Sequence, residues 1–146
     1  MPRVSVIIPA YNAEEHIEQA LRSVESQTYD DWEIVVCDDC STDRTAEFAH
    51  VRTEANSGPA VARNLAISHS SGELLAFLDA DDYWPPTYLE RLVELHDSSD
   101  EDVGIVACNA ALLQEERLRP DTHMDVVRFP EEVTLPGSCR PTRSSA

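Results

Sequence analysis

Short apolar runs that alternate with segments of helical periodicity constrain the fold of this chain more than any other feature. The runs are rich in Val, Ile and Leu, a composition typical of buried parallel strands. They lie at residues 4–8, 32–37, 73–78 and 103–109, with a shorter strand expected at 50–53. Strands that alternate with helices predict an α/β fold, with a mostly parallel sheet flanked by helices.

Helices are predicted between these strands from apolar spacing and capping residues. Asn12 is a candidate N-cap for the first helix, with Glu15 three residues later. The apolar residues of that helix repeat at helical spacing from Ile17 to Val24. Further helices are expected within residues 41–49, 56–70, 85–96 and 111–120.

The pattern weakens after residue 110. The 146 residues suit one domain of ordinary size, but the segment from 111 to 146 is rich in Pro and turn residues. We expect residues 1–110 to form the ligand-binding part of the fold. Residues 111–146 are expected to form an atypical, partly loose C-terminal tail.

The charge of the chain excludes some classes of partner. The formal net charge is −17, and all 11 basic residues other than His are Arg. Such an excess of acid repels nucleic acid, so we expect no nucleic-acid partner. The absence of Lys favours adaptation to high salt over simple solubility, because the Debye length falls to about 3 Å at 1 M salt.

The sequence also bears on location. No window reaches the roughly 18 apolar residues of a membrane span. Residues 1–12 make a poor signal peptide, because Pro9 interrupts a short apolar stretch. We expect a cytoplasmic protein, with peripheral contact at the inner face of the membrane as the alternative.

Two of the four cysteines, Cys37 and Cys40, have the C-x-x-C spacing of redox pairs and zinc half-sites. Cys108 and Cys139 are isolated, so no second C-x-x-C completes a four-ligand zinc site. In a cytoplasmic chain, reduced thiols at a strand end are the expected state.

Polar residues follow three of the predicted strands. They form the segments 9–12 (PAYN), 38–43 (DDCSTD) and 79–82 (DADD). Ligands of parallel α/β sheets bind beyond the carboxyl ends of the strands. We therefore expect these three segments to converge on one crevice.

The last segment places three carboxylates, Asp79, Asp81 and Asp82, directly after a buried strand. An ionised carboxylate placed beside an apolar core costs free energy through desolvation, unless a cation balances its charge. Mg²⁺ typically binds one or two carboxylates together with substrate phosphates, so Mg²⁺ or Mn²⁺ holding a diphosphate is one interpretation. A solvated acidic turn is the other.

Three further side chains are candidates for nucleotide binding. Tyr11 can stack on a base, or can be an ordinary surface Tyr. Asp39 can accept a hydrogen bond from a base N–H, or can cap the helix expected from Ser41. Arg63 can reach a phosphate or the acidic segment, or can be a surface Arg.

Four ordered segments carry a family resemblance. Residues 4–12, 26–45, 56–67 and 72–82 resemble the successive motifs of family-2 glycosyltransferases with the GT-A fold, and the similarity extends over about residues 3–110. The resemblance implies a Rossmann-like sheet, truncated here on its C-terminal side. It implies inverting transfer of a sugar from a nucleotide-diphosphate donor, commonly UDP-linked, to a glycan, lipid or protein.

The resemblance also implies roles for individual residues. Tyr11 and Asp39 would grip the base, and Asp79 and Asp81 would lie at the ribose and the metal, with Asp81 the direct ligand. The expected nucleotide-binding residues are Pro9, Ala10, Tyr11, Asn12, Asp38, Asp39, Arg63 and Asp79. The expected metal-binding residues are Asp81 and Asp79, with Mg²⁺ or Mn²⁺ as the ion.

The sequence departs from the family in three places. Cys40 stands where the family usually has Gly, and residues 45–58 are shorter than usual, which predicts a reduced second helix. The family's general base and acceptor-binding half lie beyond the equivalent of Ala146, so a partner chain is a further expectation. Acids of the tail match no base motif, namely Asp121, Asp125, Glu131 and Glu132.

Two other classes of protein remain open. A non-catalytic nucleotide-binding or interaction module would share the same strand ends. A phosphoacceptor signalling domain also binds Mg²⁺ at the ends of parallel strands, but it needs a Lys that this chain does not have.

Overall fold

The computed structural model describes residues 1–99, 104–106, 111–114 and 117–122. The chain divides into two compact units, Met1–Gly104 and Ile105–Ala146. The first unit contains the sheet and the helices that position the candidate site, and the second contains a short hairpin.

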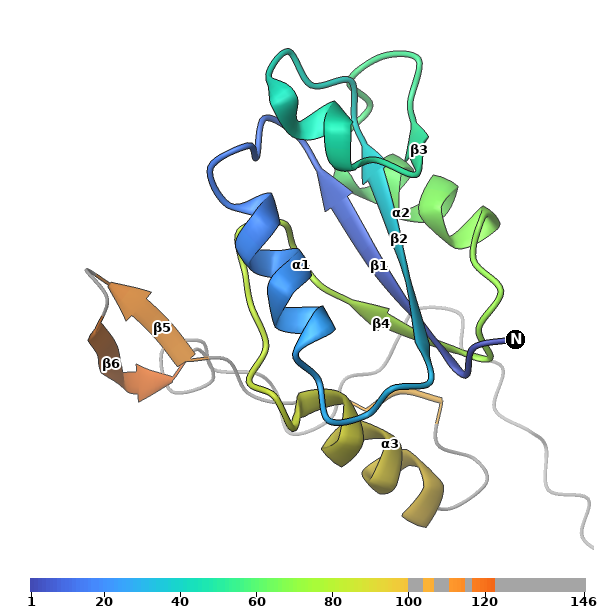
Figure 1. Ribbon diagram of the computed structural model, residues 1–146, viewed down its shortest axis with the longest axis vertical. Coiled ribbons are helices and arrows are strands. Elements are labelled where there is room, and N and C mark those ends of the chain that lie inside the picture. Colours follow the sequence, from blue (N-terminus) through green and yellow to red (C-terminus); the bar gives the residue numbers. More distant parts are fainter. Residues whose placement is uncertain (100–103, 107–110, 115–116, 123–146) are drawn as a thin grey trace, which may run out of the picture. The chain divides into compact units, whose positions relative to one another are not determined.

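A four-stranded parallel sheet forms the centre of the first unit (Figure 1). Its strands are β1 (Val4–Ala10), β2 (Trp32–Asp38), β3 (Val51–Arg52) and β4 (Leu74–Phe77), in the spatial order β3-β2-β1-β4. β1 pairs with β2 along its whole length, from Val4↔Trp32 to Ala10↔Asp38. The predicted α/β class and the strands expected near 4–8, 32–37, 50–53 and 73–78 are confirmed. The expected burial of 73–78 is wrong, because Leu75 and Phe77 of β4 are exposed.

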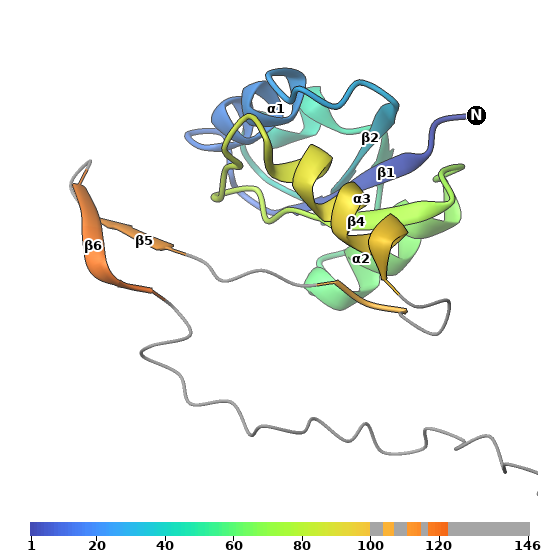
Figure 2. The same ribbon diagram turned by 90° about the horizontal axis from the view of Figure 1, so that it is seen from below.

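Helices cover both faces of this sheet. They are α1 (Ile17–Glu25), α2 (Pro59–Ser68) and α3 (Tyr88–Ser98), with a 3₁₀ helix η1 at Arg44–Phe48. α1 and α3 lie on one face of the sheet and α2 on the opposite face (Figures 1 and 2). Among the described helices, none is both long and apolar enough to cross a membrane.

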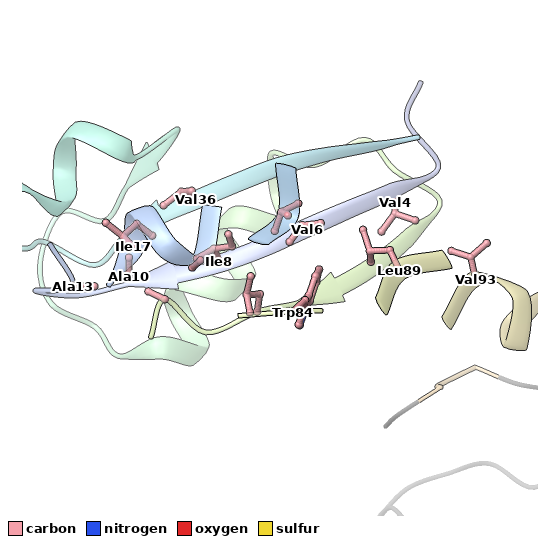
Figure 3. Close-up of a cluster of buried hydrophobic side chains, with 14 residues drawn as sticks. Val4, Val6, Ile8, Ala10, Ala13, Ile17, Val36, Trp84, Leu89 and Val93 are labelled. Carbon is pink, nitrogen blue, oxygen red and sulfur yellow. The ribbon is translucent and has the colours of Figure 1, made fainter. Parts of the chain in front are cut away.

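β1 is buried on both faces, which explains its continuous apolar run. Successive side chains of a strand point to opposite faces. Val4, Val6 and Ile8 therefore pack with α1 and α3, in the cluster that Figure 3 shows. Ile7 points the other way and packs against α2 through Ala62 and Ala66.

Two helix predictions near the site need correction. α1 begins at Ile17 after His16, so Asn12 is not its N-cap. The segment 41–49 forms only the short η1, with Asp43 accepting a hydrogen bond from the backbone N–H of Thr45. The short length of residues 45–58 predicts a reduced second helix, and η1 agrees with that prediction.

The prediction of a helix over 111–120 is wrong. Instead, β5 (Ala111–Gln114) and β6 (Arg117–Thr122) form an antiparallel pair. The backbone register places Leu113 opposite Leu118, and Pro120 is incompatible with a helix interior.

The strand predicted over 103–109 is not found in its described part. Residues 104–106 belong to no strand, and the remaining four positions lie outside the described residues. Cys108, Cys139 and the tail acids Asp125, Glu131 and Glu132 also lie outside the described residues, whereas Asp121 belongs to β6.

Candidate functional site

Two adjoining cavities lie beyond the carboxyl ends of β1, β2 and β4. Their volumes are about 310 Å³ and 140 Å³, and both are lined by Pro9, Tyr11 and Pro59. Small-molecule sites typically occupy about 300–1,000 Å³, so the larger cavity reaches that range. The three polar segments that follow the strands do converge, as the fold class predicts.

The smaller cavity, called here the base cavity, has mostly apolar walls and one carboxylate. Its lining residues are Pro9, Ala10, Tyr11, Asp39, Asn56, Gly58, Pro59 and Ala62. Tyr11 is 49% exposed although it follows a fully buried strand, so its ring is available at the cavity. A mostly apolar cavity beside an exposed aromatic ring suits the stacking of a planar ring system.

Asp39 is buried at the base cavity and is held by three donors. Its carboxylate accepts hydrogen bonds from Thr53 Oγ1 at 2.8 Å and from the backbone N–H groups of Ser57 and Gly58 at 3.0 and 2.7 Å. Burial alone would raise the pKa of Asp39, but these hydrogen bonds outweigh it and hold the pKa below its ordinary value. Asp39 therefore stays ionised and fixes the loop that leads into α2.

Asp38, the neighbouring residue, does not line either cavity. It is fully buried, its carboxylate pairs with Arg52 Nε at 2.9 Å, and it accepts a hydrogen bond from the backbone N–H of Ser41. The structure thus gives Asp38 a role in holding the loop after β2.

The larger cavity, called here the acidic cavity, combines acids with one guanidinium. Its lining residues are Pro9, Tyr11, Asn12, Ala13, His16, Pro59, Arg63, Asp79, Ala80 and Asp81. Arg63 of α2 forms an ion pair with Asp79. Among the described residues, none forms a hydrogen bond or ion pair with the carboxylate of Asp81, an exposed residue that lines the cavity.

Asp82 adds to the negative charge of this strand end. Although its side chain is exposed, nearby protein atoms partly desolvate the carboxyl group, and the charges of Asp81 and Asp79 add to this effect. Together they raise the pKa of Asp82 above its ordinary value. A cation placed here would relieve this repulsion.

The acidic cavity fits a hard divalent ion in part. Asp81 and Asp79 offer oxygen ligands, which Mg²⁺ and Mn²⁺ prefer. Among the described residues, no group of three or more His, Cys, Asp or Glu side chains could hold an ion by itself. The protein would therefore supply only part of the coordination, as is usual for Mg²⁺ bound with substrate phosphates.

The loop after β1 and the loop after β2 are joined by reciprocal hydrogen bonds. Asn12 accepts at its side-chain oxygen from the backbone N–H of Thr42 at 2.9 Å, and its own N–H donates to Ser41 Oγ at 2.9 Å. The backbone of Asn12 is in the left-handed region, with φ of 47°. Asn12, one of the expected nucleotide-binding residues, thus uses its side-chain oxygen to join the two loops.

The two cysteines of the C-x-x-C pattern have different environments. Burial, together with the charges of Asp39 and Asp38, raises the pKa of the Cys37 thiol to about 11. Cys40 has a φ of 63°, a left-handed backbone that Gly adopts at least cost. Both thiols are free.

Several lining residues escaped the sequence predictions. Asn56 and Pro59 belong to a segment that carries the family resemblance, so their positions could have been inferred from it. His16 belongs to no such segment, and only the geometry of the loop after β1 brings it to the acidic cavity. Ala13 and Ala80 contribute small side chains that leave the cavity open.

Comparisons with known proteins agree with this arrangement. The model of a family described as "Glycosyl transferase family 2" matches residues 5–145. The UDP-Glc:alpha-D-GlcNAc-diphosphoundecaprenol beta-1,3-glucosyltransferase WfgD of Escherichia coli is 44% identical over 101 residues, which is 63% of this chain and 40% of that protein. The chain spans about two fifths of the length of the curated relatives it matches.

Solved structures share the fold. The S. aureus TarS 1–349 structure in complex with UDP superposes with a TM-score of 0.61 at 35% identity, covering 65% of this chain and 32% of that one. A mannosyltransferase from Pyrobaculum calidifontis, in complex with GDP-Man and Mn²⁺, superposes with a TM-score of 0.54 at 35% identity, covering 57% and 29%.

Proposed function

Because the chain belongs to glycosyl transferase family 2, we propose that its two cavities bind a nucleotide-diphosphate sugar, with UDP as the nucleotide, together with Mg²⁺ or Mn²⁺. The reaction is inverting transfer of the sugar to a glycan, lipid or protein. One observation carries the proposal: a cavity with an aromatic ring and a buried carboxylate adjoins a cavity with two carboxylates and a guanidinium.

The base cavity is proposed to hold the uracil ring. Tyr11 would stack on the ring, with Pro9 and Ala62 as apolar contacts. Asp39 stays ionised, so its carboxylate can accept a hydrogen bond from the N–H of uracil without a proton transfer. Its existing hydrogen bonds hold it in place before the ligand arrives.

The acidic cavity is proposed to hold the diphosphate and the sugar. Asp81, with Asp79, would bind the divalent ion, and the bound ion supplies Lewis-acid stabilisation of the departing diphosphate. Arg63 orients Asp79 through their ion pair and places its positive charge beside the diphosphate. The general base has no assigned residue among those that the structure describes.

The names of related proteins support UDP and a metal. The printed name of WfgD includes UDP-Glc and a lipid-linked diphosphoundecaprenol sugar. The TarS structure contains UDP, and the mannosyltransferase structure contains Mn²⁺. An acceptor in the membrane would place this protein in the cytoplasm at the inner face of the membrane.

The test is calorimetric titration with UDP in Mn²⁺ and in excess chelator. We expect binding that depends on Mn²⁺, loss of that dependence in Asp81→Asn, and full retention of it in Asp30→Asn. Asp30 is an exposed acid that lines neither cavity, so it controls for the loss of one charge. Equal UDP affinity with and without the ion would contradict the metal assignment.

A second measurement separates an enzyme from a non-catalytic nucleotide-binding module. UDP-sugars are incubated with Mn²⁺ and a panel of acceptors, and released UDP is measured. Release above the rate of the Asp81→Asn variant supports a transferase. UDP binding without any release favours the binding module.

A further inference from the structure

We infer that Asn12 is a positioning residue, not a nucleotide ligand, and that it acts with Thr45 to present Tyr11 to the base cavity. The inference rests on the proposed nucleotide site. It assigns a task to the contacts between residues 12–14 and residues 41–45, which are called here the loop clasp.

The loop clasp begins with three consecutive backbone N–H groups. Those of Asn12, Ala13 and Glu14 each donate to a side chain of residues 41–45, which include the loop after β2 and the start of η1. Their acceptors are Ser41 Oγ at 2.9 Å, Thr45 Oγ1 at 2.8 Å and Asp43 Oδ2 at 3.2 Å. A run of this kind fixes three successive peptide units, so the loop after β1 has little freedom to rotate.

Two backbone N–H groups donate in the opposite direction, and Thr42 Oγ1 also donates to Asn12 Oδ1 at 3.3 Å. The backbone N–H of Thr42 donates to Asn12 Oδ1 at 2.9 Å, and that of Arg44 donates to Glu14 Oε2 at 3.0 Å. Each loop therefore satisfies backbone groups of the other. η1 lies beyond the carboxyl ends of β1 and β2, where these loops meet (Figure 1).

The hydrogen bond from the Ala13 N–H to Thr45 Oγ1 is buried, so its loss should cost more free energy than the loss of the other contacts of the loop clasp. Thr45 is fully buried, and Ala13 is 8% exposed. A buried N–H that loses its acceptor costs its full desolvation penalty. Thr45 therefore has a strong effect on the loop although it lines neither cavity.

The position of Asn12 connects the loop clasp with Tyr11. Tyr11 lies between the last residue of β1, Ala10, and the left-handed turn at Asn12. Both neighbours are held, one by the sheet and the other by the loop clasp. Since Asn tolerates this backbone conformation and its oxygen binds Thr42, the residue both turns the chain and anchors the turn.

Thr45 offers a matched pair of variants. Thr45→Val keeps the shape of the side chain but removes the acceptor for Ala13, and Thr45→Ser keeps the acceptor. The affinity for UDP in Mn²⁺ is measured by calorimetry, and folding is checked by thermal melting. We expect Thr45→Val to weaken binding about tenfold while folded, the effect of one lost hydrogen bond, and Thr45→Ser to restore most of the affinity.

A double-mutant cycle with Tyr11→Ala separates positioning from general damage. If the loop clasp acts through Tyr11, Thr45→Val should cost no further affinity once the ring is absent. An equal loss in both backgrounds would overturn the inference.

Asn12 itself is tested with uridine, which carries no phosphate charge. Asn12→Asp keeps the acceptor for Thr42, and Asn12→Gly keeps the backbone freedom but loses the acceptor. Positioning predicts that the Asp variant binds uridine better than the Gly variant. Both variants lack the side-chain amide N–H of Asn12, so an equal loss of uridine affinity in the two would instead identify that group as a ligand and overturn the inference. If the wild type binds neither UDP nor uridine, the proposed function itself fails.

Discussion

At the scale of single residues, the exposure of Tyr11 next to a fully buried strand calls for an explanation that a packing role cannot give. We predict that Tyr11→Ala weakens UDP binding by about 1–3 kcal/mol, by analogy with base–aromatic stacking on nucleic acids. Calorimetry measures the change. Tyr83→Ala is the control, since Tyr83 is 43% exposed and lines neither cavity. A dissociation constant that is the same in both variants would reduce Tyr11 to a surface residue.

Cys40 carries a backbone cost that a smaller residue would relieve. A left-handed conformation costs a non-glycine residue roughly 1–2 kcal/mol, and Gly loses roughly 0.5–1 kcal/mol of that gain through chain entropy. We predict that Cys40→Gly raises the free energy of unfolding by up to about 1 kcal/mol, measured by urea denaturation. Cys40→Val should lower it, because branching at Cβ worsens the clash. The reverse order of stabilities would show that the thiol contributes more than the backbone costs.

Adjacent acids show where residue roles can and cannot be predicted from sequence. Asp38 and Asp39 are both predicted nucleotide-binding residues, yet only Asp39 lines a cavity. The reason is geometric, because consecutive side chains at a strand end point to opposite sides. Which of the two faces the ligand depends on the register of β2 with β1 and on the loop that donates to Asp39. The contacts of Asn12 with the loop after β2 could not be predicted either, since its partners lie 29 and 30 residues away in the chain.

At the scale of secondary-structure elements, the approach of the chain to β4 depends on Gly72, where a side chain would clash with β1. A Cβ on Gly72 would lie 2.6 Å from Ser5 Oγ and 2.7 Å from the Ser5 backbone nitrogen. We predict that Gly72→Ala lowers the free energy of unfolding by about 1–3 kcal/mol, since β1 and β4 would have to move apart. Urea denaturation measures it.

Gly104→Ala provides the control for this substitution, because a Cβ there would meet nothing within 4 Å. Its free energy of unfolding should stay close to that of the wild type. If the two Ala variants unfold alike, the approach of residue 72 to β1 is not a constraint on the fold.

Burial made β1 and β2 predictable from sequence. β1 and β2 are apolar because neighbours cover both faces, and that pattern is visible in the sequence. The segments 41–49 and 111–120 carry no such signal. In the first, Ser41, Asp43 and Thr45 make contacts with the other loop in place of a longer helix. In the second, the backbones of β5 and β6 pair with each other, a pairing that helical spacing does not reveal.

At the scale of the whole molecule, the net charge of −17 opposes the compact state. We predict that the melting temperature rises by several degrees between about 0.1 M and about 2 M KCl, because salt screens repulsion among the carboxylates. The gain should shrink near the isoelectric point of about 4.4, where that repulsion is small. A melting temperature that stays flat or falls at neutral pH would argue against salt adaptation.

The loop clasp has a consequence for how the site distinguishes its ligands. Many α/β proteins bind a phosphate through free backbone N–H groups in the loop after the first strand or at the start of a helix. Here the N–H groups of Asn12, Ala13 and Glu14 are donated to side chains, and those of Ser57 and Gly58 are donated to Asp39. Neither loop offers them to an anion, and the acids at the end of β4 repel one. With divalent ions present, we expect UDP to bind more tightly than uridine. Without divalent ions, we expect the uncharged nucleoside uridine to bind more tightly than UDP. The ion content of the solution would then select which of the two molecules is recognised.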